Sequence, residues 1–254
     1  MAGSLTIRGL AKAYRAGDGS ETQVLGGIDL DVPAGSIVSV VGLNGSGKTT
    51  LLRILAGLEA PTRGVIAIDG RPPALGGPRG IGLVCQDVAL LPWRTVRGNI
   101  ALGLEVRHVP AATRLALVRE YEDAFGLADS SGRYPRELSG GMRQKAAIAR
   151  TLIADPGVVL MDEPFSALDC QTRNRMQAFL LDIWARRRDT IVLVTHNIEE
   201  AVLVSDRIAV ITPKPSRVEA VLPVDLPRPR TRTDAGVNAL RARIIDTLRH
   251  LCRQ

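Results

Sequence analysis

The segment GLNGSGKTT, residues 42–50, combines glycines, a lysine and hydroxyl side chains at a spacing that suits phosphate binding. It fits the pattern G-x-x-x-x-G-K-[ST] and stands between an apolar run at 36–41 and an apolar-periodic helix, so a chance glycine-rich turn is a poor alternative. The glycines let successive backbone N–H groups face phosphate oxygens, while Lys48 can reach the β- and γ-phosphates and Thr49 can bind Mg²⁺. We therefore predict a nucleotide site formed by Gly42, Leu43, Asn44, Gly45, Ser46, Gly47, Lys48, Thr49 and Thr50.

Two carboxylates follow another apolar run, at 157–161. Ligands of open α/β sheets bind at the carboxyl ends of the strands. Asp162 is therefore expected to help to hold Mg²⁺, and Glu163 to polarise the attacking water as a general base. Carboxylates that only cap the next element are the alternative, which the presence of the phosphate loop disfavours.

Two more polar residues follow strand-like runs. His196 comes after 190–195 and could donate a hydrogen bond to a γ-phosphate, and Gln86 comes after 80–84 and could orient water or bind Mg²⁺. Taken singly, His196 and Gln86 are weak evidence for a site; a lone histidine, for example, is usually structural or solvated. The repetition of such groups at strand ends favours one shared site.

Alternating strands and helices must position these residues. Buried strands are predicted at 36–41, 80–84, 157–161, 189–195 and 206–212, and helices at about 47–56, 110–126, 139–154 and 171–187. This alternation predicts a mainly parallel, doubly wound α/β sheet. The β-rich runs at 5–10 and 64–70 predict an antiparallel lobe.

The 254-residue chain is interpreted as one domain with three parts. These are a core with the β lobe (1–86 and 157–212), an inserted helical lobe (87–156) and a C-terminal extension (213–254). The proline- and arginine-rich stretch 222–234 should be extended. Helical spacing after it predicts a terminal helix, capped by Thr233 or Asp234, that packs on its own domain or, alternatively, lies on a membrane face.

Composition narrows the class of partner. The formal charge of +7 favours anionic partners, whereas an aromatic content of 3% argues against a surface for single-stranded nucleic acid. Cys85, Cys170 and Cys252 form no CxxC pair, so we expect neither a disulfide framework nor a zinc site, and a reducing compartment fits. The apolar runs are strand-sized and no signal peptide is evident, so any membrane role should come through a partner.

The segment RELSGGMRQKAAIAR, residues 136–150, provides a second helix start that suits an anion. Ser139 can cap the helix, and the N–H groups that follow add positive potential without a lysine. No strand precedes this segment, so it is not a second phosphate loop.

In this order, the motifs resemble those of the nucleotide-binding subunit of an ABC transporter, over residues 5–225. The matching motifs are the Walker A loop at 42–49, the Q-loop at Gln86, the signature LSGGMRQ, the Walker B strand LMDEP, the D-loop SALD at 166–169, the H-loop at His196, and Tyr14 as the aromatic that stacks on adenine. The resemblance implies a P-loop NTPase (RecA-like) core with an antiparallel β lobe and an inserted α-helical lobe. It also implies ATP hydrolysis with Mg²⁺.

The resemblance further implies that two copies pair head to tail, with each ATP between the Walker A loop of one and the signature of the other. Ser139, Gly140, Gly141 and Asp169 would then act in trans. No nucleic-acid partner is expected. An ABC ATPase acting on nucleic acid or cytosolic assemblies is the alternative, disfavoured by the lack of sustained heptads, and a non-enzymatic nucleotide sensor is disfavoured by Glu163.

A narrower resemblance, to the nitrate/sulfonate/taurine importer ATPases, comes from residues 90–105 and 218–234. It implies membrane permease subunits docking near Leu91 and Trp93, a periplasmic or lipid-anchored solute-binding protein as an indirect partner, and a peripheral place on the cytoplasmic side of the cell membrane. Trp93 could instead fill the core of the helical lobe. Cys85 in place of phenylalanine, and TPKPSR at 212–217 in place of RPGR, depart from the family pattern, and neither is expected to affect the chemistry.

Overall fold

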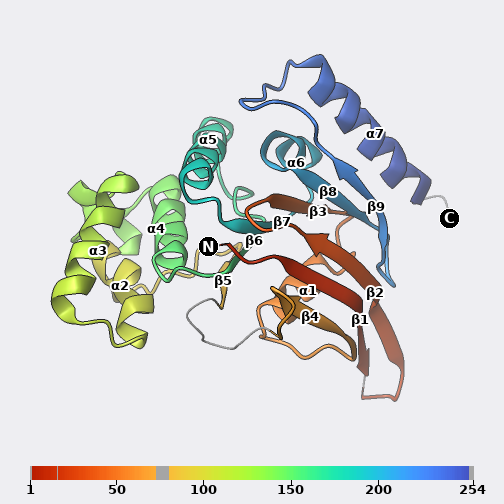
Figure 1. The fold of residues 1–254 in the computed structure, drawn as a ribbon, viewed down its shortest axis with the longest axis horizontal. Helices are drawn as coiled ribbons and strands as arrows, with labels where there is room; N and C mark the ends of the chain where they lie inside the picture. Colours follow the sequence, from red (N-terminus) through yellow and green to blue (C-terminus); the bar gives the residue numbers. More distant parts are fainter. Residues whose placement is uncertain (1, 16, 73–79, 252–254) are drawn as a thin grey trace.

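A six-stranded, mostly parallel sheet lies at the centre of the protein (Figure 1). The computed structural model describes residues 2–15, 17–72 and 80–251. In spatial order the strands are β5 (Ile81–Val84), β6 (Val158–Asp162), β7 (Thr190–Thr195), β3 (Ile37–Val41), β8 (Arg207–Ile211) and β9 (Val218–Pro223). All neighbouring pairs are parallel except β8 and β9. The predicted α/β sheet is confirmed, and it sets the carboxyl ends of β3, β5, β6 and β7 along one edge.

The apolar runs form strands here because both faces of the sheet are covered. Every residue of β3 and β7 is buried. Val38 and Val40 of β3 pack on one face with α1 (Lys48–Leu55). Ile37 and Val41 pack on the other face with residues of α5 (Cys170–Arg187) and α6 (Ile198–Val204).

An antiparallel sheet covers the α1 side, as predicted for the β lobe. Its strand order is β2 (Glu21–Val32), β1 (Leu5–Arg15) and β4 (Arg63–Ile68). The sequence did not predict β2. Acidic residues and the pair Gly26–Gly27 interrupt its alternation, and Gly27 has a φ of 113°.

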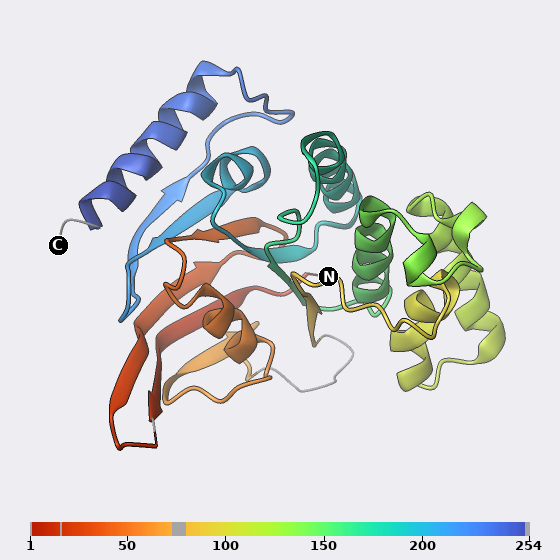
Figure 2. The ribbon, with the colours of Figure 1, turned by 180° about the vertical axis from the view of Figure 1, so that it is seen from behind.

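A helical lobe lies at one end of the molecule, opposite α7 (Figures 1 and 2). It contains α2 (Val96–Val106), α3 (Ala111–Ala124) and α4 (Gly140–Leu152), and the predicted helices near 110–126 and 139–154 are confirmed. The helix α2 was not predicted, since Gly98 and Gly103 weaken its periodicity. Trp93, just before α2, is 71% exposed and therefore does not fill the core of this lobe.

The C-terminal residues pack on the core. The helix α7 (Ala235–Leu251) contacts α6 and β8 and buries Val237 and Ile244. Asp234 accepts hydrogen bonds from the backbone N–H and hydroxyl of Thr231. Among the residues that the structure describes, no helix is long and apolar enough to cross a membrane.

Candidate functional site

The phosphate loop connects β3 to α1 and takes a conformation that its glycines allow. Gly45 and Gly47 have φ values of 78° and 88°, in the left-handed region that disfavours side chains. A Cβ on Gly42 would lie 2.7 Å from Ile211 Cγ1. The buried Lys48 ammonium donates to the carbonyl oxygens of Gly42 (3.0 Å) and Leu43 (2.8 Å), so it lies within the loop.

A cavity of about 310 Å³ opens over this loop. Its lining consists of Asn44, Gly45, Gly47, Lys48, Thr49, Thr50, Glu163 and Lys214. The cavity therefore brings the predicted phosphate-binding residues together with the predicted general base. Burial lowers the pKa of Lys48, and the charges of Glu163 and Asp162 oppose that effect. The Lys48 ammonium and the Asp162 carboxylate thus support each other's charged forms.

Asp162, at the end of β6, presents oxygen atoms that suit a divalent cation. Burial raises the pKa of this carboxyl group, and a hydrogen bond with the Thr49 hydroxyl opposes the rise. Its Oδ1 atom is buried and has no hydrogen-bond partner among the described residues. An unpaired buried carboxylate oxygen beside a hydroxyl fits Mg²⁺, which prefers oxygen ligands and keeps several waters.

Glu163 and His196 form a pair at the edge of the cavity. Glu163 Oε1 lies 2.8 Å from His196 Nδ1, and the Glu163 backbone N–H donates to the carbonyl oxygen of Val194 (2.8 Å). Glu163 has a φ of 43°, a conformation that costs a non-glycine residue free energy and is typical of functional positions. The two predicted residues, 33 apart in sequence, thus share one hydrogen bond.

Tyr14 and Gln86 lie at the margins of the site. Tyr14 is 40% exposed on β1, and its pKa is raised chiefly by a hydrogen bond with Glu59, while a second bond with Thr50 lowers it. Thr50 is the second residue after Lys48, so this ring lies beside the start of α1. Gln86 is exposed just beyond β5, at the same sheet edge as Glu163, but it does not belong to the described lining of the cavity.

The signature and the D-loop contact each other away from the cavity. Ser139 caps α4, as predicted, by accepting a hydrogen bond from the backbone N–H of Met142 (3.3 Å). A Cβ on Gly141 would lie 2.9 Å from Thr172 Cγ2. Asp169 caps α5 by accepting from the N–H groups of Gln171 and Thr172. A hydrogen bond with the Thr172 side chain is the main reason that its pKa is lowered, and the N–H bonds add to this effect. Gly140 is also close to the D-loop, because a Cβ on Gly140 would lie 3.4 Å from Leu168 Cδ2.

The segment 212–217 corrects one expectation. Lys214 lines the cavity, and the Ser216 hydroxyl donates to the carbonyl oxygen of Ser46 in the phosphate loop. The replaced segment therefore contacts the site, contrary to the expectation. It was missed because the segment follows β8, and only the pairing of β8 with β3 brings it beside the loop.

The geometry agrees with the comparison to known families. The sequence model described as "ABC transporter" matches residues 25–166, more than half of the chain. The chain belongs to the ABC transporter family. Because the ABC match includes the phosphate loop, the signature and Asp162–Glu163, the protein is an ATP-binding subunit with the residues of an ATPase.

Curated relatives place this ABC protein among similar ATP-binding subunits. It is 44% identical over 245 residues to the aliphatic sulfonates import ATP-binding protein SsuB of Bacillus licheniformis, covering 95% of this chain and 93% of that one. It is 44% identical to the nitrate import ATP-binding protein NrtD of Synechocystis sp., covering 81% and 79%. It is also 42% identical to the bicarbonate transport ATP-binding protein CmpC of Synechococcus elongatus, but spans 35% of that longer protein.

The fold is also similar to solved structures of the same family. The post-hydrolysis dimer of the ATP-binding cassette MJ0796, bound to ADP and Pi, matches with a TM-score of 0.75 and 28% identity. The match covers 87% of this chain and 99% of that one. The predicted fold, with its β lobe and inserted helical lobe, is confirmed.

Proposed function

We propose that this ABC protein hydrolyses ATP as the motor subunit of an importer for a small oxyanion such as a sulfonate, nitrate or bicarbonate, at the cytoplasmic face of the cell membrane. The observation that carries the catalytic part is the Glu163–His196 pair at the cavity over the phosphate loop. The names of the relatives support the transport part, since three of them import oxyanions.

In this proposal, Glu163 takes the proton of the attacking water. The hydrogen bond to His196 Nδ1 holds the carboxylate in place and leaves Nε2 to face the γ-phosphate. Lys48 and the loop N–H groups hold the phosphate oxygens. Thr49 and Asp162 would bind Mg²⁺, which neutralises charge on the phosphates when bound.

We infer that the complete site needs two copies. Ser139, Gly140 and Asp169 do not line the cavity of their own chain, but they meet on one surface whose helix starts suit an anion. A head-to-tail pair would bring this surface over the partner's phosphate loop. The dimeric cassette MJ0796 supports this arrangement.

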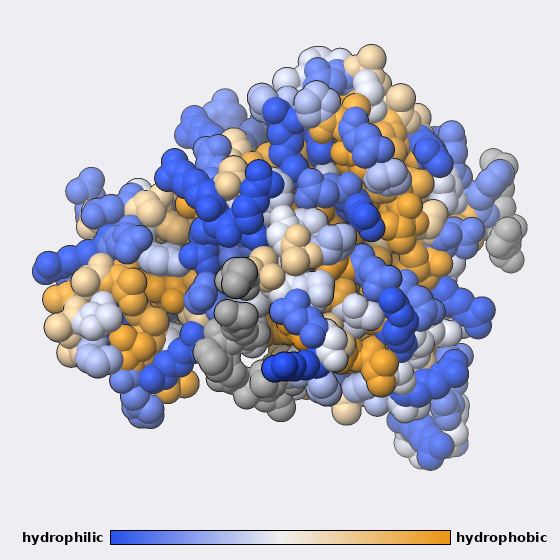
Figure 3. Space-filling view, in the orientation of Figure 1, coloured by the Kyte–Doolittle hydropathy of each residue, from blue (hydrophilic) through white to orange (hydrophobic). Residues whose placement is uncertain are grey.

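Docking of the permease is proposed at the helical lobe. Trp93 and Val106 are each 71% exposed, and Leu115 is 40% exposed. Figure 3 shows apolar surface gathered over the helical lobe at the left of the view. Leu91 is half-buried and follows the Q-loop, so a bound permease would touch the segment that leads to the ATP site. The solute-binding protein would act through the permease.

The Glu163→Gln variant tests the catalytic assignment. Glutamine keeps the size of the side chain but cannot take a proton. We expect ATP binding within about 3-fold of wild type, turnover at least ~100-fold lower, and an ATP-bound dimer that accumulates in size-exclusion chromatography. The exposed Glu120→Gln on α3 serves as the control. Turnover near the wild-type rate in Glu163→Gln contradicts the assignment of the base.

Mixing two inactive variants tests the shared site. Ser139→Asp keeps a good helix cap but places a negative charge where phosphate would bind, and Lys48→Ala removes the loop lysine. A mixed dimer retains one site with both wild-type halves. If subunits pair at random, the mixture should recover about a quarter of the wild-type ATPase rate. A mixture as inactive as its components would refute the pairing.

A further inference from the structure

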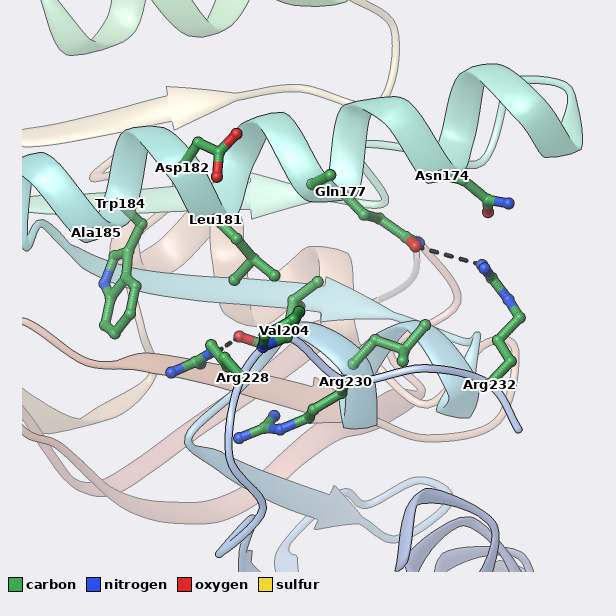
Figure 4. A pocket seen from close by; sticks show the side chains of 13 residues that line it. Asn174, Gln177, Leu181, Asp182, Trp184, Ala185, Val204, Arg228, Arg230 and Arg232 are labelled. Atoms are coloured by element: carbon green, nitrogen blue, oxygen red, sulfur yellow. Dashed lines mark hydrogen bonds between the residues drawn. The ribbon is translucent and has the colours of Figure 1, made fainter. Parts of the chain in front are cut away.

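A second cavity lies on the far side of the core from the phosphate loop. It has a volume of about 440 Å³, a size typical of sites for small molecules. Its walls are α5, the end of α6 and the arginine-rich stretch 228–232, which we call the strap (Figure 4). The cavity shares no residue with the described lining of the phosphate-loop cavity.

One wall of this strap pocket carries an uncompensated positive charge. The Arg230 guanidinium donates to the carbonyl oxygens of Val202 (2.8 Å) and Ser205 and to two carbonyls of the strap's approach, Val224 and Leu226. Carbonyl dipoles satisfy its N–H groups without cancelling its charge. Burial is the main reason that its pKa falls to about 10, so the group remains charged at neutral pH.

The neighbouring arginines leave that excess in place. Arg228 pairs with Asp206 (2.7 Å), and Arg232 pairs with Glu199. Three guanidinium groups of the strap, including Arg230, are thus matched by two carboxylates. Asp182 of α5 also lines the pocket, but it is exposed to solvent and forms no ion pair with the strap among the described residues.

Two buried donors on the same walls lack acceptors among the described residues. These are Gln177 Nε2 and Arg228 Nε. Gln177 is 5% exposed, and its Oε1 accepts a weak bond from Arg232 (3.4 Å), so its amide lies at the Arg232 end of the pocket. A buried donor without an acceptor destabilises the folded protein, and a ligand oxygen would remove that cost.

Apolar side chains also line the pocket. Leu181 and Trp184 of α5 point toward the strap in Figure 4, and Val204 closes the α6 side. The Trp184 ring lies 4.5 Å from the Arg228 guanidinium carbon, so charge and aromatic surface adjoin. We propose that the strap pocket binds a small organic anion with an apolar body, whose acidic head group faces Gln177 and Arg232 while its chain lies along Leu181 and Trp184.

Calorimetric titration of the full chain with 1-hexanesulfonate tests this proposal. Binding should saturate with a dissociation constant at or below ~1 mM, and hexanol and inorganic sulfate should each bind at least ~10-fold more weakly. Lys48→Ala should leave the affinity unchanged, which separates this site from the proposed ATP site. If Lys48→Ala abolishes saturable binding, the ligand binds at the phosphate loop and the proposal is wrong.

Variants of the pocket should change affinity in opposite directions. Gln177→Leu keeps the shape of the buried side chain but removes its donor, so affinity should fall about 5-fold. Glu199→Gln removes the carboxylate that competes for Arg232, so affinity should rise about 3-fold or more. Weaker binding in Glu199→Gln, or unchanged binding in Gln177→Leu, contradicts the head-group contacts.

A substitution that fills the pocket provides the last test of the proposal. Ala178 is an exposed residue of α5 that lines the cavity, and Ala178→Trp should reduce the affinity more than ~10-fold without loss of folding, as shown by circular dichroism. Ala112→Trp, on the exposed start of α3, is the matched control and should bind like wild type. Equal binding by both variants, or no saturation of the wild type at 10 mM (about ten times the expected constant), refutes the site.

Discussion

Asn99 of α2 holds the loop that carries the exposed Trp93, and its removal should weaken both folding and permease docking. The side chain is 0% exposed. Its Oδ1 accepts from the Leu91 N–H (2.8 Å), and its Nδ2 donates to the carbonyl oxygens of Leu91 (3.1 Å), Arg94 (3.0 Å) and Thr95 (3.0 Å). One acceptor and two donor hydrogens therefore tie residues 91–95 to the helix.

The expected loss follows from those bonds. Each hydrogen bond contributes about 1 kcal/mol net, and truncation to alanine leaves backbone groups without partners in a partly buried place. Asn99→Ala should therefore lower the free energy of unfolding by ~2–4 kcal/mol. Because the cavity over the phosphate loop shares no residue with this loop, ATP turnover without permease should stay within about 2-fold of wild type.

Urea unfolding at 25 °C measures the first effect, and ATPase assays with and without reconstituted permease measure the second. Asn99→Asp keeps the acceptor for the Leu91 N–H but loses the donors, so it should fall between Asn99→Ala and wild type. The exposed Asn174→Ala is the control and should change stability by less than ~0.5 kcal/mol. A loss below ~0.5 kcal/mol in Asn99→Ala, or full stimulation by the permease, refutes the reasoning.

Three further predictions concern other parts of the molecule. Burial raises the pKa of Glu200 from 4.5 to about 7, so the folded protein keeps a proton that the unfolded chain releases, and its stability should fall by up to ~3 kcal/mol as pH rises from 4.5 to 7. Glu200→Gln should flatten this pH dependence of stability in urea unfolding. A pH profile parallel to that of the wild type contradicts the prediction. Ser216→Ala leaves the Ser46 carbonyl oxygen without its donor, so the dissociation constant for ATP in fluorescence titration should rise about 5-fold, whereas an unchanged constant would show that the contact is dispensable. Trp93→Ala should leave stability within ~0.5 kcal/mol, because the ring is exposed, but should abolish stimulation by the permease; retained stimulation places the docking surface elsewhere.

The parts of the fold that the sequence predicted are those with strong local signals. The strands β3, β6 and β7 are uninterrupted apolar runs because both faces of the sheet are covered, and the helices α4 and α5 begin at the side-chain caps Ser139 and Asp169. The same signals placed Asp162, Glu163 and His196 at the ends of strands and Lys48 at the start of a helix. Their meeting at one edge follows from parallel pairing, which can be inferred before any contact is seen.

What the sequence did not predict depends on contacts between distant segments. The strand β2 gains its stability from pairing with β1 rather than from its own composition, and α2 is held by the Asn99 bonds and by the cap at Thr95. Neither leaves a periodic pattern. The orientation of Asn99 toward Leu91 likewise depends on tertiary packing, so no motif in the sequence marks it.

The phosphate loop itself shows why local patterns are insufficient at a site. A Cβ on Gly47 would lie 2.9 Å from Val24 Cγ1 in β2 and 3.5 Å from Ser216 Oγ, so glycine is required there by neighbours as well as by its φ of 88°. Ser216 also receives the Gly26 N–H at its carbonyl oxygen (2.8 Å) and donates its own N–H to Val24 (2.9 Å). The segment after β8 therefore joins β2 to the phosphate loop. Substitutions in 212–217 should alter nucleotide affinity through the loop's backbone, even though no residue of that segment belongs to the phosphate-binding pattern.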